Sequence, residues 1–355
     1  MFTNRPSSVA EKPRKDSKVK RISHLYEKML DRAFIKECIL LASKGKKRRK
    51  QVRETLDDID NRVEIIYKMV ENHHFEFKGT KKRVIPEYKK KREITISPFF
   101  PNQIIDYMLV TCLKPLCKRI LYEFAVGNVD GKGIRYGKEY LETKTKRYRY
   151  FIKLDIHHFY QSVSPRLLMK KLEKRVKDKD FLDFAKEVIC RFVDLPIGTY
   201  YSQWLSNFYI AEVDWIVKQE MKIPVYVRYV DDMVLFSDSA ESLIKARDRI
   251  RIALEDLGLS LKNEGYIRDI RKTPLSFLGF RFTQKGVWIR KPIIKRIAFT
   301  IEKAKAHLCL RLCRRLIALG GWLKQTSLGY CFYKTNIRDI IKFGYARRQI
   351  SNETN

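Results

Sequence analysis

The stretch that most constrains the fold of this chain is residues 226–236, which reads Tyr-Val-Arg-Tyr-Val-Asp-Asp-Met-Val-Leu-Phe. Two runs of apolar, aromatic and β-branched residues, typical of strands, flank the adjacent carboxylates Asp231 and Asp232. The pattern predicts a β-hairpin with the acidic pair at its turn. Ionised carboxylates side by side in a buried hairpin repel each other unless a cation lies between them. A divalent metal site is therefore the specific hypothesis, and an ordinary Asp-containing turn is the alternative.

A second predicted strand also ends on an aspartate. The apolar run from residue 148 ends at Asp155, and Ser164-Pro165 then opens a helix, with a capping residue followed by Pro at the first helical position. A lone Asp at a strand end is more often a turn or a cap than a ligand. If the two strands share one sheet, however, Asp155, Asp231 and Asp232 supply three carboxylates to two cations.

The charge of the chain limits its partners. There are 75 Lys and Arg against 41 Asp and Glu, which gives +34 over 355 residues. A folded chain with this excess repels itself unless a polyanion neutralises it, and nucleic acid is the usual polyanion. A ribosome-associated or chromatin-like protein would explain the charge equally well. The basic residues are spread along the whole chain, which disfavours an anionic membrane surface as the partner.

Cysteine usage and hydropathy favour a cytoplasmic protein. The seven cysteines contain no Cys-x-x-Cys pattern, which disfavours a structural zinc site and favours a reducing compartment. No apolar run is long enough to span a membrane. The polar, basic N-terminus lacks the apolar segment of a secretory signal.

The remaining segments predict further elements. We expect a flexible basic arm at residues 1–20 and, at residues 22–74, two or three helices with a basic turn between them. A hairpin with clustered cations is expected at residues 76–97, and a helix at residues 101–122. A second amphipathic helix is expected at residues 240–257, another hairpin at 276–289 and a basic helical region at 292–318. The second helix of the first group is expected at residues 52–70. The Gly-rich basic loop at residues 127–133 lacks P-loop spacing, but its backbone N–H groups could approach a phosphate.

Three carboxylates in a basic chain suit phosphoryl transfer. Two Mg²⁺ ions roughly 3.5–4 Å apart can activate a 3′-hydroxyl and stabilise the leaving pyrophosphate; Mn²⁺ is the alternative metal. Asp155 and Asp231 would be the principal ligands, Asp232 the outer one, and the backbone carbonyl of Ile156 would complete the coordination. A metal-dependent nuclease would use the same chemistry. A cationic hairpin for a triphosphate and basic helices for a duplex favour a polymerase.

With these motifs the chain resembles prokaryotic reverse transcriptases over residues 20–345. Four motifs occur in the order of that family: Lys153-Leu-Asp155-Ile-His-His-Phe-Tyr160, Leu195-Pro-Ile-Gly198 with Ser202-Gln203, Tyr229-Val230-Asp231-Asp232, and Phe277-Leu-Gly279-Phe. The resemblance implies an α+β right-hand polymerase fold, with fingers, a palm with an antiparallel sheet, and a helical thumb. It also implies synthesis of DNA from dNTPs on an RNA template, with an RNA/DNA duplex as product, in a prokaryotic cytoplasm.

The resemblance further divides the chain into regions. We expect the basic arm at residues 1–20, followed by the N-terminal helices and fingers at residues 21–148. The palm is expected at residues 149–291, the basic thumb at 292–345 and a tail at 346–355. Fingers and palm are expected to interleave near residues 165–200.

Roles for single residues follow from the same resemblance. Tyr160 takes the position of the gate that excludes a 2′-hydroxyl, with an ordinary core aromatic as the alternative. Arg92 matches the arginine of the fingers that contacts the incoming triphosphate, with Lys89, Lys90 or Lys91 nearby. The nucleotide site is expected to comprise Arg92, Lys90, His157, His158, Phe159, Tyr160, Ile197, Gly198 and Gln203, with the amides of His157 and His158 facing the triphosphate. The primer grip is expected at Phe277, Leu278 and Gly279.

One departure from the family pattern concerns fidelity. Many reverse transcriptases have Pro-Gln-Gly where this chain has Pro196-Ile197-Gly198. With Ser202-Gln203, this looks most like the reverse transcriptases of diversity-generating retroelements, which copy adenines inaccurately. Ile197 cannot offer the hydrogen bonds of a Gln, so nucleotide alignment should loosen. Residues 321–324 also resemble that group and its group II intron-like relatives.

Other biological roles stay open. The alternative is an antiphage-defence reverse transcriptase that works with a noncoding RNA, a small accessory protein or a second subunit. A retron enzyme is disfavoured because no Val-Thr-Gly follows the catalytic hairpin. A non-catalytic RNA-binding scaffold that uses the basic surface alone is the alternative from another class.

Overall fold

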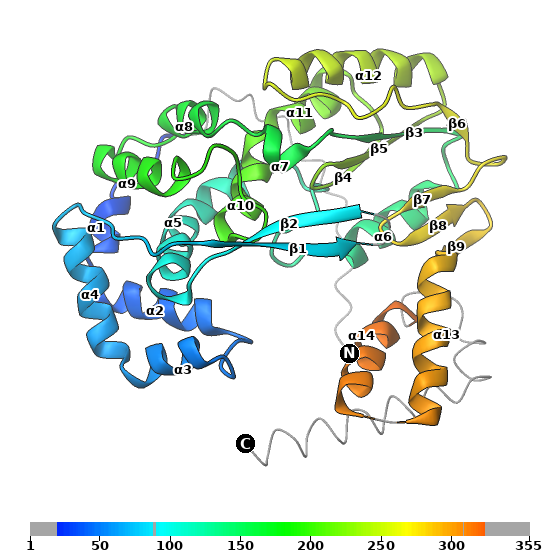
Figure 1. Ribbon diagram of the computed structural model, residues 1–355. Coiled ribbons are helices and arrows are strands. Elements are labelled where there is room, and N and C mark those ends of the chain that lie inside the picture. Colours follow the sequence, from blue (N-terminus) through cyan, green and yellow to red (C-terminus); the bar gives the residue numbers. More distant parts are fainter. Residues whose placement is uncertain (1–19, 88–89, 308, 324–355) are drawn as a thin grey trace, which may run out of the picture. The chain divides into compact units, whose positions relative to one another are not determined.

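The computed structural model describes residues 20–87, 90–307 and 309–323 (Figure 1). The chain forms two compact units, each assembled from three separate segments. Unit 1 combines the described residues up to Tyr122 with Ile156–Lys222 and Ile250–Lys262. Unit 2 combines Glu123–Asp155, Ile223–Arg249 and the described residues from Asn263 onwards.

Unit 1 is mostly helical. Its helices are α1 (Leu25–Met29), α2 (Arg32–Ser43), α3 (Lys50–Asp57), α4 (Ile59–Glu71), α5 (Ile104–Ile120), α7 (Phe159–Ser162), α8 (Pro165–Glu173), α9 (Lys179–Ile189), α10 (Tyr200–Tyr209) and α11 (Ala211–Trp215), with π-helical turns η2 (Phe99–Gln103) and η3 (Ile216–Glu220). The predicted helix at 52–70 is divided into α3 and α4 at Asp58, whose backbone leaves the helical region.

Capping side chains fix several of these helices. Ser164 accepts a hydrogen bond from the Leu167 amide at 3.3 Å, and Pro165 is the first residue of α8, which confirms the predicted helix start. Asp178 caps α9 and also accepts the amides of Leu25 and Tyr26, so it ties α1 to α9.

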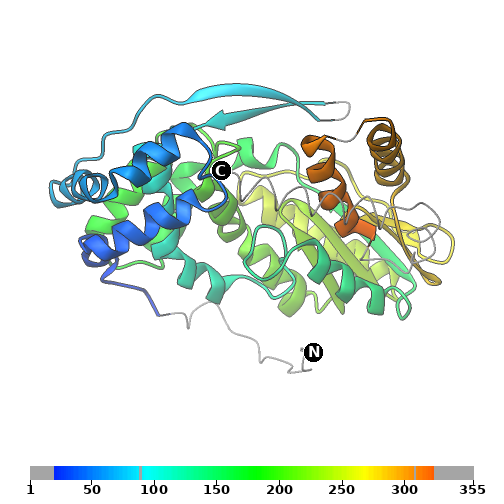
Figure 2. The same ribbon diagram turned by 90° about the horizontal axis from the view of Figure 1, so that it is seen from below.

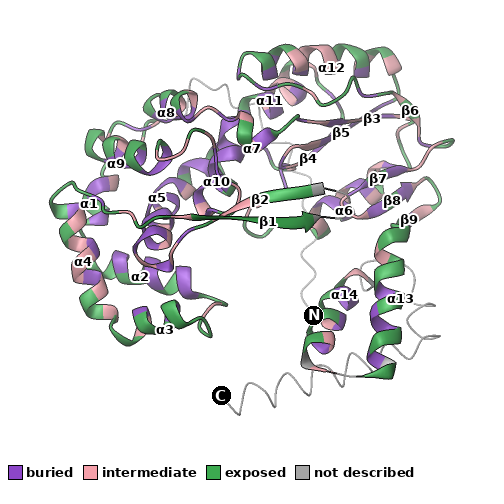
Figure 3. Ribbon diagram, in the orientation of Figure 1, coloured by how far each residue is buried: buried purple, intermediate pink, exposed green. Residues whose placement is uncertain are grey.

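A two-stranded hairpin completes unit 1. Strands β1 (Lys81–Glu87) and β2 (Lys90–Ile96) pair antiparallel, with Lys81 opposite Ile96 (Figure 2). This confirms the hairpin predicted at residues 76–97. Its described residues in β1 are exposed along the strand, as the colouring of Figure 3 shows. Such a surface is solvated and cationic, which suits a contact with an anion better than a place in a core.

Unit 2 contains two antiparallel sheets. The first has the order β4 (Val225–Tyr229), β5 (Asp232–Ser237), β3 (Tyr150–Asp155) and β6 (Arg268–Asp269). The second has the order β7 (Leu275–Phe277), β8 (Phe280–Thr283) and β9 (Gly286–Ile289). The predicted neighbourhood of the two aspartate-bearing strands is confirmed, because β3 pairs directly with β5.

One hydrophobic core serves both sheets of unit 2. It includes Phe151, Val227, Phe236, Phe280 and Phe282, all at most 2% exposed. Burying each such side chain contributes about 1.5–3 kcal/mol. Helices α6 (Ile134–Lys144), α13 (Lys291–Ala306) and α14 (Leu310–Leu323) add Leu141, Ile297 and Leu316 to this core. Helix α12 (Ala240–Glu255) was predicted at residues 240–257. Its residues up to Arg249 belong to unit 2, and those from Ile250 belong to unit 1.

Some expectations differ from the structure. The mixture of helices and antiparallel sheets agrees with the α+β class. The chain divides into two interleaved units, and the expected division into fingers, palm and thumb stays a prediction. The basic helical region is divided at His307, whose backbone is extended, into α13 and α14. The arm at 1–19, residues 324–345 of the expected thumb, and the tail lie outside the described residues. Among the described residues, no helix is long and apolar enough to cross a membrane.

Candidate active site

The ends of two paired strands bring the predicted carboxylates of unit 2 together. Asp155 is the last residue of β3 and lies directly opposite Asp232, the first residue of β5. Asp231 directly precedes Asp232 and is the second residue of the two-residue turn, Val230-Asp231, that joins β4 to β5. All three residues are half-buried. The register therefore brings Asp155 and Asp232, which are 77 positions apart in the chain, to the same end of the sheet.

A lysine that sequence reasoning did not single out neutralises part of this charge. The Nζ atom of Lys153 lies 2.9 Å from Oδ1 of Asp232, and the same Nζ atom is 5.7 Å from the ring centroid of Phe277. Side chains alternate along a strand, so Lys153, two residues before Asp155, lies on the same face of the sheet as Asp155. This two-residue spacing in the sequence could have identified Lys153 as a neighbour of the carboxylates. Lys153 thus links the carboxylates to the hairpin predicted as the primer grip.

The donor set of this edge fits a hard divalent cation. Carboxylate oxygens are the ligands that Mg²⁺ and Mn²⁺ prefer, and Asp155 and Asp232 face each other across paired strands. Among the described residues, no three Asp, Glu, His or Cys side chains gather closely enough to form a metal cluster. The ion pair between Asp232 and Lys153 agrees with the expectation that Asp232 is the outer carboxylate.

The hairpin predicted as the primer grip has a tight turn. Phe277 pairs with Phe280, and the two residues between them, Leu278 and Gly279, both have positive φ, at 50° and 81°. That sign pattern belongs to a type I′ turn. A Cβ atom on Gly279 would collide with the ring of Trp322 in α14, so Gly279 is required by close packing as well as by its backbone.

In unit 1, the segment after Asp155 differs from one expectation. The amide of His157 donates to the carbonyl of Ser260 at 2.8 Å, so its predicted contact with a triphosphate is wrong for this conformation. Ile156 is buried and forms a β-bridge with Leu261. His158 has a left-handed backbone, with φ 44° and ψ 43°, at the start of α7. Its amide as a phosphate donor stays a prediction.

Tyr160 and the Pro-Ile-Gly loop lie against each other in unit 1. Tyr160 is half-buried in α7, and its carbonyl accepts the amide of Leu195 at 3.2 Å. Phe159 is only 3% exposed, so its side chain belongs to the core. The contact between Tyr160 and Leu195 places the expected sugar gate beside the loop that carries Ile197.

The same loop contacts the β1–β2 hairpin. The carbonyl of Ile197 accepts the amide of Thr95 at 2.7 Å. A Cβ atom on Gly198, whose φ is 114°, would lie 2.6 Å from the Thr95 carbonyl oxygen. Only Gly combines this backbone with this approach. Thr95 is on β2, three residues beyond Arg92, so unit 1 brings the loop and the strand of Arg92 together.

The other predicted nucleotide-binding residues are placed as follows. Arg92 is exposed and lies opposite Ile85 in the hairpin. Lys90 is the first residue of β2, and its side chain lies outside the described part of the chain, as does Lys89. Gln203 is exposed on α10. These positions agree with, but do not test, their expected roles.

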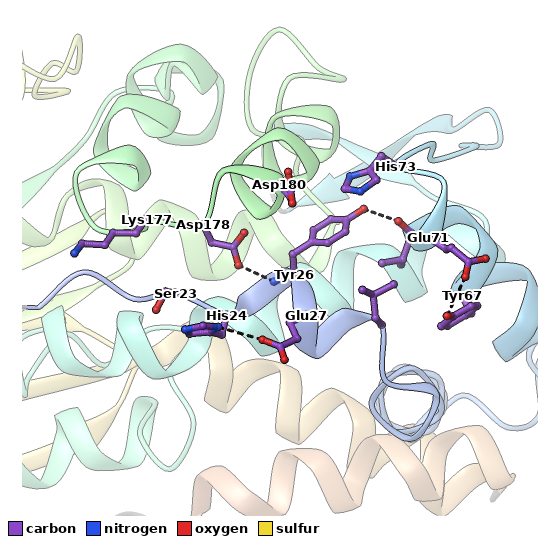
Figure 4. Close-up of a pocket in the computed structure, with 12 residues that line it drawn as sticks. Ser23, His24, Tyr26, Glu27, Tyr67, Glu71, His73, Lys177, Asp178 and Asp180 are labelled. Atoms are coloured by element: carbon purple, nitrogen blue, oxygen red, sulfur yellow. Dashed lines mark hydrogen bonds and ion pairs between the residues drawn. The ribbon is translucent and has the colours of Figure 1, made fainter.

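A separate hollow in unit 1 has another composition. It has a volume of about 490 Å³ and is lined by residues of α1, α4 and the start of α9 (Figure 4). Tyr26 stacks on His73 with 4.7 Å between ring centroids, and its hydroxyl donates to the Val70 carbonyl. None of the residues predicted to act in catalysis lines it. Polar groups that line this hollow are hydrogen-bonded within the chain, so we assign it no function.

Comparison with known proteins supports the chemistry suggested by the carboxylates. Residues 78–282, more than half of the chain, match the family model described as reverse transcriptase (RNA-dependent DNA polymerase). The retron Ec83 reverse transcriptase of Escherichia coli is 24% identical over 182 residues, which cover 43% of this chain and 56% of that protein. The chain thus matches little more than half the length of this relative, which belongs to the retron group that the sequence argument disfavoured. The chain belongs to the reverse transcriptase family, as its motifs and its paired catalytic strands indicate.

Proposed function

We propose that this chain is an RNA-directed DNA polymerase that joins dNTPs to a primer 3′-hydroxyl on an RNA template. The observation that carries the proposal is the register of β3 and β5, which places Asp155 opposite Asp232 with Asp231 in the adjoining turn. Two-metal phosphoryl transfer needs ligands for two divalent cations, and these carboxylates would supply them. The match to the family over residues 78–282 supports the same reaction.

Each group has a part in the proposed reaction. Asp155 and Asp231 would hold the two Mg²⁺ ions, with the Ile156 carbonyl as a further ligand and Asp232 as the outer carboxylate. The bound ions would activate the primer hydroxyl and stabilise the leaving pyrophosphate. Arg92 binds the triphosphate of the incoming nucleotide, and Tyr160 excludes a 2′-hydroxyl. Phe277 and its hairpin hold the primer end.

Basic helices supply the duplex contacts in this proposal. Exposed cations lie on both described helices of the expected thumb, at Lys291, Lys295, Arg296, Lys303, Arg311, Arg314 and Arg315. Side chains of this kind bind phosphates without reading sequence. They support an RNA/DNA duplex as the bound product.

A primer-extension assay tests the proposal. Purified protein is incubated with Mg²⁺, dNTPs and a primer annealed to an RNA template. We expect extension with dNTPs and at least tenfold less with NTPs, because Tyr160 excludes the 2′-hydroxyl. RNA binding without any incorporation would instead establish the non-catalytic scaffold.

The biological role has two candidates that different observations favour. Ile197 in place of Gln favours error-prone copying in a diversity-generating retroelement. Similarity to a retron reverse transcriptase favours an enzyme that works with a noncoding RNA, as in the defence alternative. If Ile197 loosens alignment, Ile197→Gln lowers misincorporation opposite template adenine several-fold, measured by sequencing the products. Unchanged misincorporation would remove the argument for the retroelement from this residue.

A further inference from the structure

We propose that Arg228 and Gly127 brace the Val230-Asp231 turn, and that Arg228 is a positioning residue for the carboxylate of Asp231. This inference rests on the proposed function. We call these two residues and their contacts with Val230 the turn brace.

The first observation is a fully buried cation. Arg228 is 0% exposed and is the one cationic residue among the largest fully buried side chains that the structure describes. Burying a guanidinium costs several kcal/mol unless its N–H groups are used. Its Nη1 atom donates to the carbonyl of Val230 at 3.0 Å. The side chain therefore bonds to the backbone of the residue that precedes Asp231.

The second observation is the backbone of that residue. Val230 has φ 59°, in the left-handed region where a β-branched residue is an outlier. Positive φ at the first central residue alone is the sign pattern of a type II′ turn, in which Gly is usual. Holding Val in this region costs conformational free energy, so the surrounding structure must impose it.

The third observation is a backbone packed beneath the turn. A Cβ atom on Gly127 would lie 2.6 Å from the Val230 amide nitrogen and 2.7 Å from Val230 Cγ2. The neighbouring residues hold this approach in place. Arg228 donates its amide to the Phe124 carbonyl at 3.0 Å, and its own carbonyl accepts the Val126 amide at 2.8 Å. Gly127, which lies in the loop whose N–H groups could approach a phosphate, thus packs against the Val230-Asp231 turn.

Together these contacts fix the direction of Asp231. The Arg228 guanidinium holds the Val230 carbonyl, and the Gly127 backbone leaves no room for the Val230 peptide to move towards it. Because a turn with two central residues has few torsions, fixing Val230 fixes the Cα–Cβ direction of Asp231. A small displacement of this carboxylate would impair cation binding, since catalytic groups must be held within about 0.5 Å.

Gly127→Ala tests the brace without removing any charged group. We expect the added methyl group to displace the Val230 peptide, to lower kcat at least tenfold and to raise the Mg²⁺ concentration that gives half-maximal rate. Binding of the primed template should not change. Gly79→Ala is the matched control, because nothing lies within 4 Å of its added Cβ atom.

Arg228 variants supply the second arm. Arg228→Met should shift the Mg²⁺ requirement in the same direction, and Arg228→Lys, which retains a charged donor, should restore part of the rate. Folding is monitored by thermal unfolding, and Gly127→Ala decides the case if Arg228→Met does not fold. Folded variants with wild-type kcat and wild-type Mg²⁺ requirement would overturn the brace, whereas an inactive wild-type protein would overturn the proposed function.

Discussion

The two functional hairpins of this chain place their charges in opposite ways. The β4–β5 hairpin is buried along both strands and ends in a strained two-residue turn that carries Asp231. The β1–β2 hairpin presents an exposed strand and an exposed Arg92. Carboxylates that bind cations require exact positions, whereas a cation that attracts a triphosphate acts over a longer range. Burial therefore accompanies the group with the narrower geometric requirement.

The largest effect is expected from removing the charge of Asp231, in the buried β4–β5 hairpin. Asp231→Asn keeps the size of the side chain and removes its charge, so we expect at least a thousandfold loss of primer extension, about 4 kcal/mol of transition-state stabilisation. Binding of the primed RNA template, measured by fluorescence anisotropy, should stay within twofold. The exposed Asp183→Asn in α9 is the control. Retained activity in the Asp231 variant would refute the assignment of the metal ligands.

A smaller effect is expected from the exposed hairpin. Arg92→Ala should raise KM for dNTP by ten- to a hundredfold and change kcat less, because the arginine contributes binding of the triphosphate. Lys82→Ala is the matched control, since Lys82 is on β1, opposite Thr95, and pairs with Glu93 at 2.7 Å. Steady-state kinetics with varied dNTP measures both variants. Equal KM values for the two would remove Arg92 from the nucleotide site.

A smaller effect is expected from Lys153, the cation that pairs with Asp232. The Lys153–Asp232 ion pair is about 38–39% exposed on both sides, so solvent screens it and it contributes at most about 1 kcal/mol. Lys153→Met removes a positive charge beside the carboxylates. We expect the half-saturating Mg²⁺ concentration to fall two- to fivefold, measured by titrating the initial rate. A rise would show that Lys153 supports cation binding instead of opposing it.

The last effect is on stability and not on the reaction, and it concerns Asp106, a buried acid of α5. Burial raises the pKa of Asp106 to about 7, and Arg191 at 3.1 Å opposes the rise. The folded state therefore binds this proton more tightly than the unfolded state, so stability falls as pH rises from about 4 to about 7. Asp106→Asn should flatten this slope, measured by thermal unfolding between pH 4 and pH 7. An unchanged slope would contradict this origin.

Local patterns predicted the elements well. The hairpins of residues 76–97, 226–236 and 276–289 and the capped start of α8 follow from strand-forming runs, turn residues and the Ser-Pro pair, and all are present. The pairing of β3 with β5 was inferred from chemistry, since cations need converging carboxylates. It could not have been derived from spacing alone.

Contacts between distant residues were not predictable in this way. Arg228 reads as a polar residue in a strand, and only the fold shows that its side chain is buried and bonded to Val230. Gly127 reads as part of a flexible loop until its approach to Val230 is seen. The use of the His157 amide by Ser260 depends on residues more than 100 positions away. Each depends on tertiary packing, which local propensity does not encode.

The central claim is that Asp155, at the end of β3, and Asp231, in the turn between β4 and β5, hold the catalytic cations. Manganese binding measured by electron paramagnetic resonance tests it most directly, in protein bound to an RNA template, a dideoxy-terminated primer and the matching dNTP. The structure predicts two bound Mn²⁺ ions per ternary complex in the wild-type chain, and loss of at least one in Asp155→Asn with template binding intact. Unchanged Mn²⁺ binding in Asp155→Asn would contradict the claim.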